Sequence, residues 1–274
     1  MGLSDWKRIT SRSNPLIVRT AKLSSRKFRE ETSSFFFEGV HLLEEYLRFG
    51  WTPETVFVRE DCAGRYADLL SRVPEEALTV VPGSVFDKLT TEQAPQGILT
   101  VSPFLPCVPS VSDPEELHGR ILMLESVRDS GNVGTVIRTA AAFGWTCLLT
   151  SDCADVWSQK TVRASMGTLF SGCAAVCADP AAFVRACAKT GRRVFAAALG
   201  DGERLGSFDI RPDDCFVVGN EGQGISSGLL EAAGRIVTIP MTGNAESLNA
   251  AVAASVLMWE GSRGGQNLNN NERQ

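Results

Sequence analysis

Hydrophobic and polar residues follow two distinct periods along the N-terminal half of the chain. Short apolar runs of strand type are separated by segments whose apolar residues recur at helical spacing. A helix is also expected from Asn14-Pro15, a helix start signal, to about Glu30. The further expected strands cover 35–39, 55–60, 77–81 and 97–102, and the further expected helices cover 40–50, 63–72 and 84–91. This alternation predicts an α/β domain of roughly a hundred residues.

Four prolines interrupt this pattern and favour an extended linker: Pro103, Pro106, Pro109 and Pro114. The alternation then restarts, with strands expected over 120–126, 146–151, 192–199, 215–219 and 235–240, and helices over 133–144 and 246–260. Consecutive buried strands with crossover helices predict a mostly parallel sheet covered on both faces. We therefore expect an N-terminal domain over 1–105, a linker over 106–118, a second domain over 119–262 and a disordered polar tail over 263–274.

The composition is that of an ordinary globular protein, with 43% hydrophobic and 22% charged residues among 274. No apolar run approaches the roughly 18–20 residues needed to cross a bilayer, and the first residues lack the apolar segment of a secretion signal. The eight cysteines form no CxxC pair and stand far from His41 and His118, so no zinc site is expected. We interpret them as reduced core residues of a cytoplasmic protein, with a Cys173–Cys177 pair as the alternative.

Charge is distributed unevenly, which changes the meaning of a net charge of −5. Residues 1–30 hold eight cations against Asp5 and Glu30, a balance of +6, so the rest of the chain carries −11. A basic N-terminal face on an acidic body suits a polyanion such as a nucleic acid, although a solvated amphipathic helix has the same pattern. The cations expected to contact it are Arg8, Arg12, Arg19, Lys22, Arg26 and Lys27.

Unusual polar residues follow the first strand of the second domain, and ligands of open α/β sheets gather at such strand ends. Asn132 stands at the entrance of the expected helix, and Arg138 lies nearly two turns further on. The simplest interpretation makes Asn132 a helix cap and Arg138 a surface cation. However, Arg138 is flanked in sequence by apolar residues such as Val136 and Ile137. We therefore expect a half-buried guanidinium with an anionic partner such as phosphate.

Two later strand ends carry comparable signals. Strand 215–219 runs into a glycine-rich loop with Glu221 at its centre, whose spacing fits neither a dinucleotide loop nor a P-loop. After the last strand, Ser247 and Asn249 open an alanine-rich helix, where Ser247 suits a cap and asparagine is a poor interior residue. An apolar stripe on this helix predicts a core or a subunit interface, and it consists of Leu248, Val252, Val256 and Trp259.

Together these segments resemble the SpoU (TrmH) family of RNA ribose methyltransferases. Its three motifs appear as Asn132-x-Gly134-x-x-x-Arg138, as Gly219-Asn-Glu-Gly-Gln-Gly224, and as Ile239-Pro-Met241 with Ser247-Leu-Asn249. Arg163-Ala-Ser-Met-Gly167 is a further match. The N-terminal half resembles the family's ribosomal-protein-like substrate domain through Ser13-Asn-Pro15-Leu16, Phe37-Glu-Gly39 and Pro95-Gln-Gly97-Ile98. The resemblance covers nearly the whole chain except its tail.

The resemblance implies a C-terminal parallel α/β sheet with a deep trefoil knot, the SPOUT type, beside a smaller N-terminal α/β RNA-binding domain. It implies a homodimer with the C-terminal helix in its interface, S-adenosylmethionine as the cofactor, and no metal. By motif position, the residues expected to bind the cofactor are Gly219, Glu221, Gly222, Ile239, Met241 and Leu248.

The implied activity is methyl transfer from S-adenosylmethionine to a ribose 2′-hydroxyl of structured RNA, with ribosomal RNA favoured over transfer RNA. Arg138 corresponds to the family's catalytic arginine; because a free guanidinium has a pKa above roughly 12, we expect it to hold the RNA phosphate rather than to act as a base. Asn132, Glu221, Ser247 and Asn249 would then organise the arginine and the ribose. The alternatives are a transfer RNA ribose or base methyltransferase, or a non-catalytic RNA-binding protein that keeps the fold.

Overall fold

The chain divides into two compact units, each with its own sheet. The structure is a computed structural model that describes residues 6–243 and 246–263. The N-terminal unit comprises Met1–Pro106 with Asp155–Ser171, and the C-terminal unit comprises Cys107–Ala154 with Gly172–Gln274. The polar tail expected from 263 onward lies outside the described residues, apart from Arg263.

The N-terminal unit contains a five-stranded mixed sheet in the order β1-β4-β3-β5-β2. β3 and β4 are parallel, whereas β5 is antiparallel to both of its neighbours, β2 and β3. The strands are β1 Lys7–Arg8, β2 Ser34–Glu38, β3 Thr55–Arg59, β4 Leu78–Val81 and β5 Ile98–Pro103. The helices include α1 Pro15–Lys22, α2 Arg26–Thr32, α3 Val40–Arg48, α4 Ala67–Leu70 and α5 Gly83–Phe86. The α/β class expected for this half is confirmed.

The basic N-terminal segment forms two helices, α1 and α2, where the sequence predicted one. Asn14 caps α1 by accepting a hydrogen bond from the Leu16 amide, with Pro15 in the first turn. The chain breaks at 23–25 because Leu23 is buried in the core and Arg29, itself buried, donates to the carbonyl oxygens of Leu23 and Ser24 at 2.6 and 3.0 Å. A continuous helix would use those carbonyls for its own backbone bonds.

Residues 155–171 come late in the chain but complete the N-terminal unit. They form α7 Gln159–Ala164 and the 3₁₀ helix η4 Thr168–Ser171. The guanidinium of Arg29 pairs with Asp155, with Nε 2.9 Å from Oδ2, so the charge of this buried arginine is compensated. Trp157 and Phe170 pack against Phe35 on β2, with ring centroids 4.6 and 6.5 Å away. This segment therefore supplies part of the core of the unit, and it includes the Arg163–Gly167 match.

The two N-terminal motif segments, 37–39 and 95–98, meet at the end of β2. Gln96 Oε1 accepts a hydrogen bond from the Val40 amide at 2.8 Å, and the Gly39 amide donates to Ile98. Gly97 has a φ of +84°, and a Cβ there would lie 2.6 Å from Cys62 Sγ. The glycine is thus required both by its backbone conformation and by close packing.

The C-terminal unit contains an eight-stranded sheet in the order β11-β13-β10-β12-β7-β8-β9-β6, with every neighbouring pair parallel. Its strands are β6 Ser110–Val111, β7 Ile121–Leu124, β8 Thr146–Thr150, β9 Ala174–Cys177, β10 Val194–Ala197, β11 Glu203–Arg204, β12 Cys215–Val218 and β13 Ile236–Thr238. The parallel sheet expected from the sequence is confirmed. The linker was expected over 106–118, but residues 107–118 belong to this unit and supply its edge strand β6.

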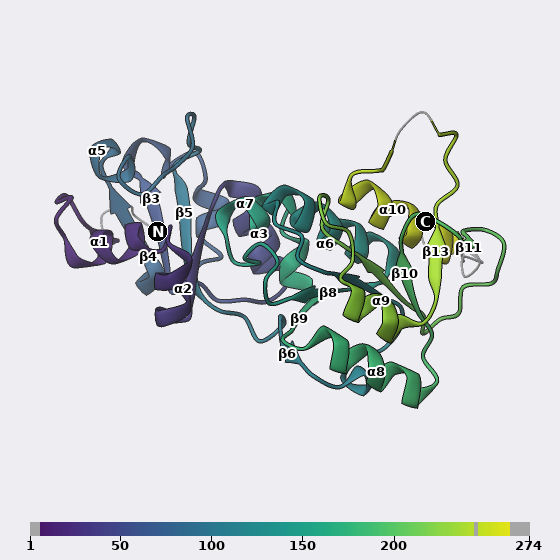
Figure 1. The fold of residues 1–274 in the computed structure, drawn as a ribbon. Helices are drawn as coiled ribbons and strands as arrows, with labels where there is room; N and C mark the ends of the chain where they lie inside the picture. Colours follow the sequence, from purple (N-terminus) through teal and green to yellow (C-terminus); the bar gives the residue numbers. More distant parts are fainter. Residues whose placement is uncertain (1–5, 244–245, 264–274) are drawn as a thin grey trace. The chain divides into compact units, whose positions relative to one another are not determined.

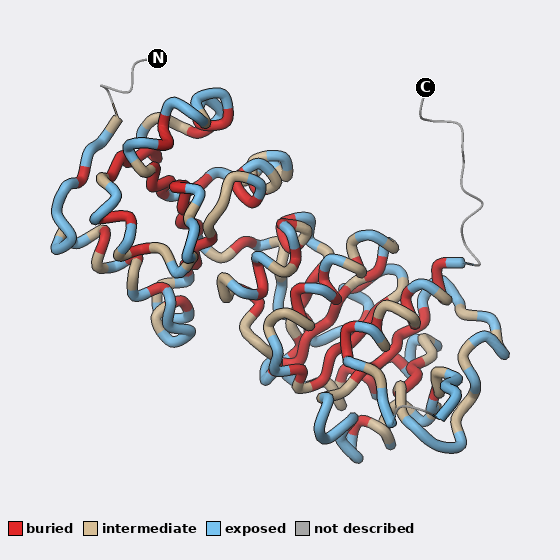
Figure 2. Tube along the Cα trace, turned by 90° about the horizontal axis from the view of Figure 1, so that it is seen from above, coloured by how far each residue is buried: buried red, intermediate tan, exposed pale blue. Residues whose placement is uncertain are grey.

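Helices cover both faces of this parallel sheet (Figure 1). The contacting pair α6 Ser130–Phe143 and α10 Ala250–Arg263 packs on one face, and α8 Pro180–Thr190 with α9 Ser227–Ala233 packs on the other. Alternate residues of β7 serve the two faces: Ile121 and Met123 join the core beneath α8 and α9, whereas Leu122 is buried outside that cluster. Buried residues follow the strands through this unit (Figure 2). The trefoil knot stays a prediction.

Candidate functional site

Three strand-end loops of the C-terminal unit converge on one pocket of about 390 Å³. They follow β10, β12 and β13, and the start of α10 closes the pocket. Because neighbouring parallel strands end at the same edge of a sheet, segments far apart in sequence meet here. Ser247 is part of the lining, and so are all six residues expected to bind a cofactor: Gly219, Glu221, Gly222, Ile239, Met241 and Leu248.

The pocket is largely apolar and has one charged lining residue among those described, Glu221. Ile239, Met241 and Leu248 supply apolar surface, and the Gly219–Gly224 loop adds backbone polar groups. Such a lining suits a ligand with a flat apolar body, polar edges and a cationic centre.

The loop after β12 is a tight ring closed by its own backbone. Asn220 and Gly224 exchange two hydrogen bonds, at 3.1 and 2.8 Å. A Cβ at Gly219 would lie 2.3 Å from the Gly224 carbonyl carbon, so this position accepts no larger residue without displacing the loop. Asn220 Oδ1 accepts from the Gly222 and Gln223 amides at 2.8 and 3.2 Å, and its Nδ2 donates to the Ser126 carbonyl oxygen at 2.9 Å. Asn220, which the sequence reasoning did not single out, therefore holds the loop in shape.

The end of β7 anchors the same loop through a buried carboxylate that sequence reasoning missed. Glu125 is 7% exposed, and its two oxygens accept from the Ser226 amide and hydroxyl at 2.8 and 2.6 Å. Ser126 donates to Asp152 beyond β8. Burial acts to raise the pKa of Asp152, but hydrogen bonds from Ser126 and Thr150 outweigh it and leave that pKa lowered. An acid directly after the apolar run 121–124 was the available signal for Glu125.

Asn132, Glu221 and Asn249 form one hydrogen-bonded chain at the edge of the pocket. Asn132 Nδ2 donates to Glu221 Oε1 at 2.5 Å, and Asn249 Nδ2 donates to Asn132 Oδ1 at 3.2 Å. The structure thus brings together three of the five residues expected to be catalytic. It places Ser247 in the adjoining pocket lining.

The local positions of the two asparagines differ from the sequence-based interpretation. Asn249 precedes α10 and caps it, accepting from the Ala251 and Val252 amides at 2.9 and 3.3 Å, rather than lying inside the helix. Asp129 caps α6 by accepting from the Asn132 amide, so Asn132 is the third helical residue. Because Asp129 takes the capping role, the Asn132 side chain is free to reach Glu221.

The expectation of a half-buried Arg138 is wrong, because this residue is exposed on α6. Its sequence neighbours Val136, Ile137 and Ala140 are buried, but the helical period turns them towards the core and Arg138 away from it. Arg138 lies outside the lining of the pocket and has no ion pair within the described part of the chain. Its guanidinium is therefore available to an anion that approaches from solvent.

Four of the six cations expected to contact RNA have carboxylate partners in the N-terminal unit. Arg8 pairs with Glu60 at 2.6 Å and Arg19 with Glu54 at 3.1 Å, both across long sequence distances. Arg26 and Lys27 pair with Glu30 and Glu31 one helical turn later, at 2.8 and 3.8 Å. All four pairs are exposed, so each contributes little stability but offsets a charge counted as free in the sequence. Arg12 and Lys22 have no carboxylate partner among the described residues.

The cysteines behave mainly as core residues, since six of the eight are buried. Burial raises the pKa of the Cys107 and Cys187 thiols to about 11, so both stay protonated at neutral pH. No group of three or more His, Cys, Asp or Glu side chains within residues 6–243 and 246–263 could hold a metal ion. Across the same residues, every helix is too short or too polar to span a lipid bilayer.

Comparison with known proteins covers both units. Residues 119–259 match the SpoU rRNA Methylase family, and residues 14–100 match the MRM3-like substrate binding domain. The chain is 30% identical to the 23S rRNA (guanosine(2553)-2'-O)-methyltransferase RlmP of Bacillus subtilis, over 92% of this chain and 98% of the relative. It is 28% identical to the 23S rRNA (uridine(2479)-2'-O)-methyltransferase of Streptomyces viridochromogenes, over 94% and 92%. An AdoMet-bound rRNA methyltransferase from Sinorhizobium meliloti superposes with a TM-score of 0.81, 29% identity, and coverage of 95% and 98%.

Proposed function

Because the chain belongs to the SpoU rRNA methylase family, we propose that it transfers a methyl group from S-adenosylmethionine to a ribose 2′-hydroxyl of ribosomal RNA. The observation that carries this proposal is the convergence of three strand-end loops on one pocket whose rim holds Asn132, Glu221 and Asn249. The relatives from B. subtilis and S. viridochromogenes are named for this reaction on 23S rRNA, which favours ribosomal over transfer RNA.

The lining of the pocket suits the cofactor in both polarity and charge. Bound S-adenosylmethionine supplies an electrophilic methyl group on a positively charged sulfur. The carboxylate of Glu221 is the lining charge of opposite sign, while Ile239, Met241 and Leu248 provide apolar surface for the adenine. The Gly219–Gly224 loop adds backbone polar groups beside the apolar surface, and its glycines allow close approach.

The residues around the pocket act on the RNA. A ribose hydroxyl is a weak nucleophile, so it must be held in line with the methyl group and lose its proton during attack. We assign Arg138 to the RNA phosphate, since its guanidinium is exposed and outside the pocket lining. Asn132, Ser247 and Asn249 orient the ribose beside Glu221, and phosphate or water accepts the proton.

A homodimer through α10 is part of the proposal. Val252 and Trp259 on this helix are 48% and 51% exposed. Large apolar side chains exposed side by side mark an interaction surface. They border a hollow of about 540 Å³ between α6 and α10 that Asn132 and Asn249 also line. We expect Trp259→Glu to give monomers in sedimentation velocity while the wild type sediments as a dimer; a monomeric wild type would contradict this part.

Two further features rest on family membership. The C-terminal sheet is proposed to hold the trefoil knot, with the loops after β12 and β13 forming the pocket inside it. A cytoplasmic location is proposed as well, since six of the eight cysteines are buried, where cysteine serves as a small hydrophobic residue.

The direct test is mass analysis of nucleosides from ribosomal RNA incubated with the protein and S-adenosylmethionine. We expect a 2′-O-methylated nucleoside that is absent without protein. A methylated base in its place would assign the chain to base methylation, and transfer RNA modified in preference to ribosomal RNA would change the substrate class. An absence of product on all RNAs would favour a binding protein that keeps the fold.

A further inference from the structure

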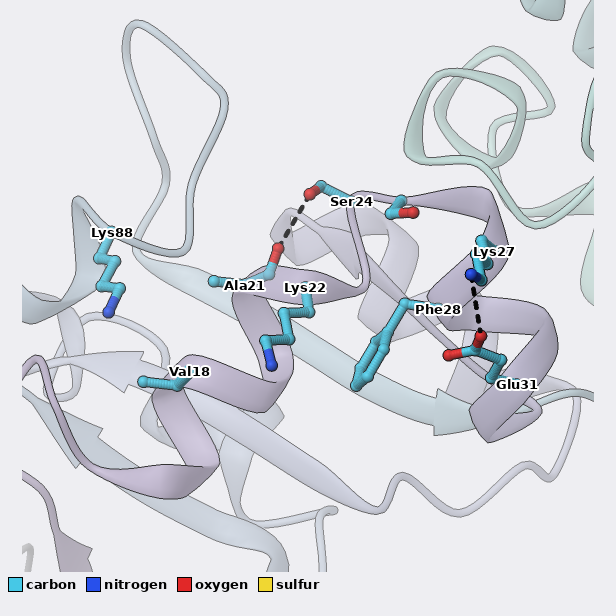
Figure 3. A pocket seen from close by; sticks show the side chains of 9 residues that line it. Val18, Ala21, Lys22, Ser24, Lys27, Phe28, Glu31 and Lys88 are labelled. Atoms are coloured by element: carbon cyan, nitrogen blue, oxygen red, sulfur yellow. Dashed lines mark hydrogen bonds and ion pairs between the residues drawn. The ribbon is translucent and has the colours of Figure 1, made fainter.

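A second hollow, of about 620 Å³, lies in the N-terminal unit between α1, α2 and the residues after α5. Val18, Ala21 and Phe28 give it an apolar floor, and Lys22, Lys27 and Lys88 supply cations around it (Figure 3). The break at 23–25 creates this hollow, because it sets α1 and α2 as separate helices with Phe28 between them.

Phe28 is the one aromatic residue of the lining within the described part of the chain. It is partly buried, packing against the core cluster of the unit, while its ring projects into the hollow (Figure 3). Lys22 Nζ lies 5.8 Å from the ring centroid. An aromatic ring fixed from behind and bordered by cations is the arrangement on which proteins stack unpaired nucleobases.

Two of the three cations here, Lys22 and Lys88, differ from the ion-paired ones of the unit. Lys22 has no carboxylate partner among the described residues, and Lys88 Nζ donates to the Arg12 carbonyl oxygen at 2.8 Å, which leaves two further N–H donors. Lys27 pairs weakly with Glu31, at 3.8 Å. Three cations against one acid make the lining positive.

We propose that this hollow binds an unpaired nucleotide of the RNA substrate, with its base on Phe28 and the flanking phosphates at Lys22 and Lys88. Val18 and Ala21 complete the apolar contact with the base. A base inside a duplex presents only its edges, so the hollow selects a loop, a bulge or a single strand. This inference rests on the proposed function for the identity of the ligand as RNA, and it adds Phe28 and Lys88 to the residues that contact it.

The experiment measures binding of the full-length protein to fluorescent RNA by anisotropy, at several salt concentrations. Three probes of equal length are compared: a single strand, a duplex, and a single strand with abasic sites. The variants are Phe28→Leu, which keeps an apolar side chain, and the double variant Lys22→Ala/Lys88→Ala. Lys189→Ala, at the exposed end of α8 in the C-terminal unit, is the matched control for loss of a lysine.

The wild type is expected to bind the single strand more tightly than the duplex or the abasic strand. Phe28→Leu should weaken single-strand binding by roughly 5- to 100-fold and leave abasic binding unchanged, as loss of one stacked base predicts. The double lysine variant should weaken both single strands and lower the salt slope by about 0.7 for each lysine. Lys189→Ala should bind as the wild type does.

Equal binding of normal and abasic strands by the wild type would overturn the proposal, as would unchanged binding by both sets of variants. A preference for the duplex would overturn it too. Methyl transfer to ribosomal RNA is measured in parallel: if it occurs while Phe28→Leu binds RNA normally, the proposed function stands and the hollow does not. If the hollow discriminates bases while no RNA is methylated, the nucleotide site stands and the proposed function fails.

Discussion

The pocket of the C-terminal unit was expected from motif residues at strand ends, whereas the basic face of the N-terminal unit was expected from a count of charges. The structure brings the motif residues together but pairs most of the counted cations with acids. Motif residues spread from 219 to 248 line a single pocket. Four of the six cations counted on the basic face instead pair with carboxylates, two of them more than thirty residues away in sequence. A residue type at a strand end is positioned by the sheet, whereas a charge can be offset by any acid that the fold brings near.

The comparison also separates two kinds of charged residue. Glu125 is buried and accepts two hydrogen bonds from Ser226, directly after the Gly219–Gly224 loop. Arg8 and Arg19 are exposed and paired only with single glutamates. The first kind of residue maintains the geometry of a site. The second kind contributes little, because water can replace its ion-pair partner. Substitutions at the pocket of the C-terminal unit should therefore have larger effects on activity, affinity or stability than substitutions of the paired cations in the N-terminal unit.

The largest effect is expected for Arg138→Ala. Loss of the phosphate contact should lower methyl transfer by about 100-fold or more, because the ribose hydroxyl is then poorly positioned. Affinity for S-adenosylmethionine, measured by titration calorimetry, should stay within a few-fold of wild type because Arg138 lies outside the pocket lining. A comparable loss of cofactor affinity would instead place Arg138 in the cofactor site.

The next effect is expected for Gly219→Ala, with Gly228→Ala, in the first turn of α9 and outside the pocket lining, as the matched control. A Cβ at 219 meets backbone atoms at 2.3 Å, whereas a Cβ at 228 meets no atom within 4 Å. Displacement of the loop should weaken S-adenosylmethionine binding by roughly 10- to 100-fold for Gly219→Ala and far less for the control. Equal affinities of the two variants, measured by calorimetry, would contradict the role of the loop.

A smaller effect is expected for Glu125→Gln. An amide group would face the Ser226 donors with only one acceptor oxygen, so one donor loses its partner. The free energy of unfolding should fall by about 1–3 kcal/mol, measured by urea denaturation. An unchanged midpoint of denaturation would show that this carboxylate does not hold the loop.

The smallest effect is expected for Arg8→Ala and Arg19→Ala. Each removes an exposed ion pair, so the free energy of unfolding should change by about 0–1 kcal/mol. Because their charges are already offset by Glu60 and Glu54, RNA affinity should fall by less than about 3-fold for each. If either variant weakened RNA binding as strongly as Lys22→Ala/Lys88→Ala, the distinction between paired and available cations would collapse.

Much of the fold follows from periodicity, because buried parallel strands are short apolar runs separated by helices. The break between α1 and α2 could not be predicted from periodicity. It depends on Leu23 and on Arg29, whose partner Asp155 lies 126 residues further along the chain. The same limit applies to residues 155–171, whose packing against β2 is set by tertiary contacts such as Trp157 on Phe35.

The candidate site was predictable for residues at strand ends. It was less predictable for residues on helices, where the position within the helical turn decides which way a side chain points. The motif positions gave the pocket lining, including Ile239 and Leu248. The apolar residues next to Arg138 in sequence led to the wrong prediction that Arg138 is half-buried, because adjacent helical residues point in different directions. Likewise, Asn249 proved to be a cap because α10 begins four residues later than the alternation predicted.

Hydrogen–deuterium exchange, followed by mass spectrometry with and without S-adenosylmethionine, tests the central claim most directly. It reports amide protection segment by segment and requires no RNA and no turnover. The account predicts that the cofactor protects 218–225, 237–241 and 247–253 together, while exchange in α1 and α2 is unchanged. Protection confined to one of these segments, or centred on α1 and α2, would contradict the convergence of the three loops on a single cofactor site.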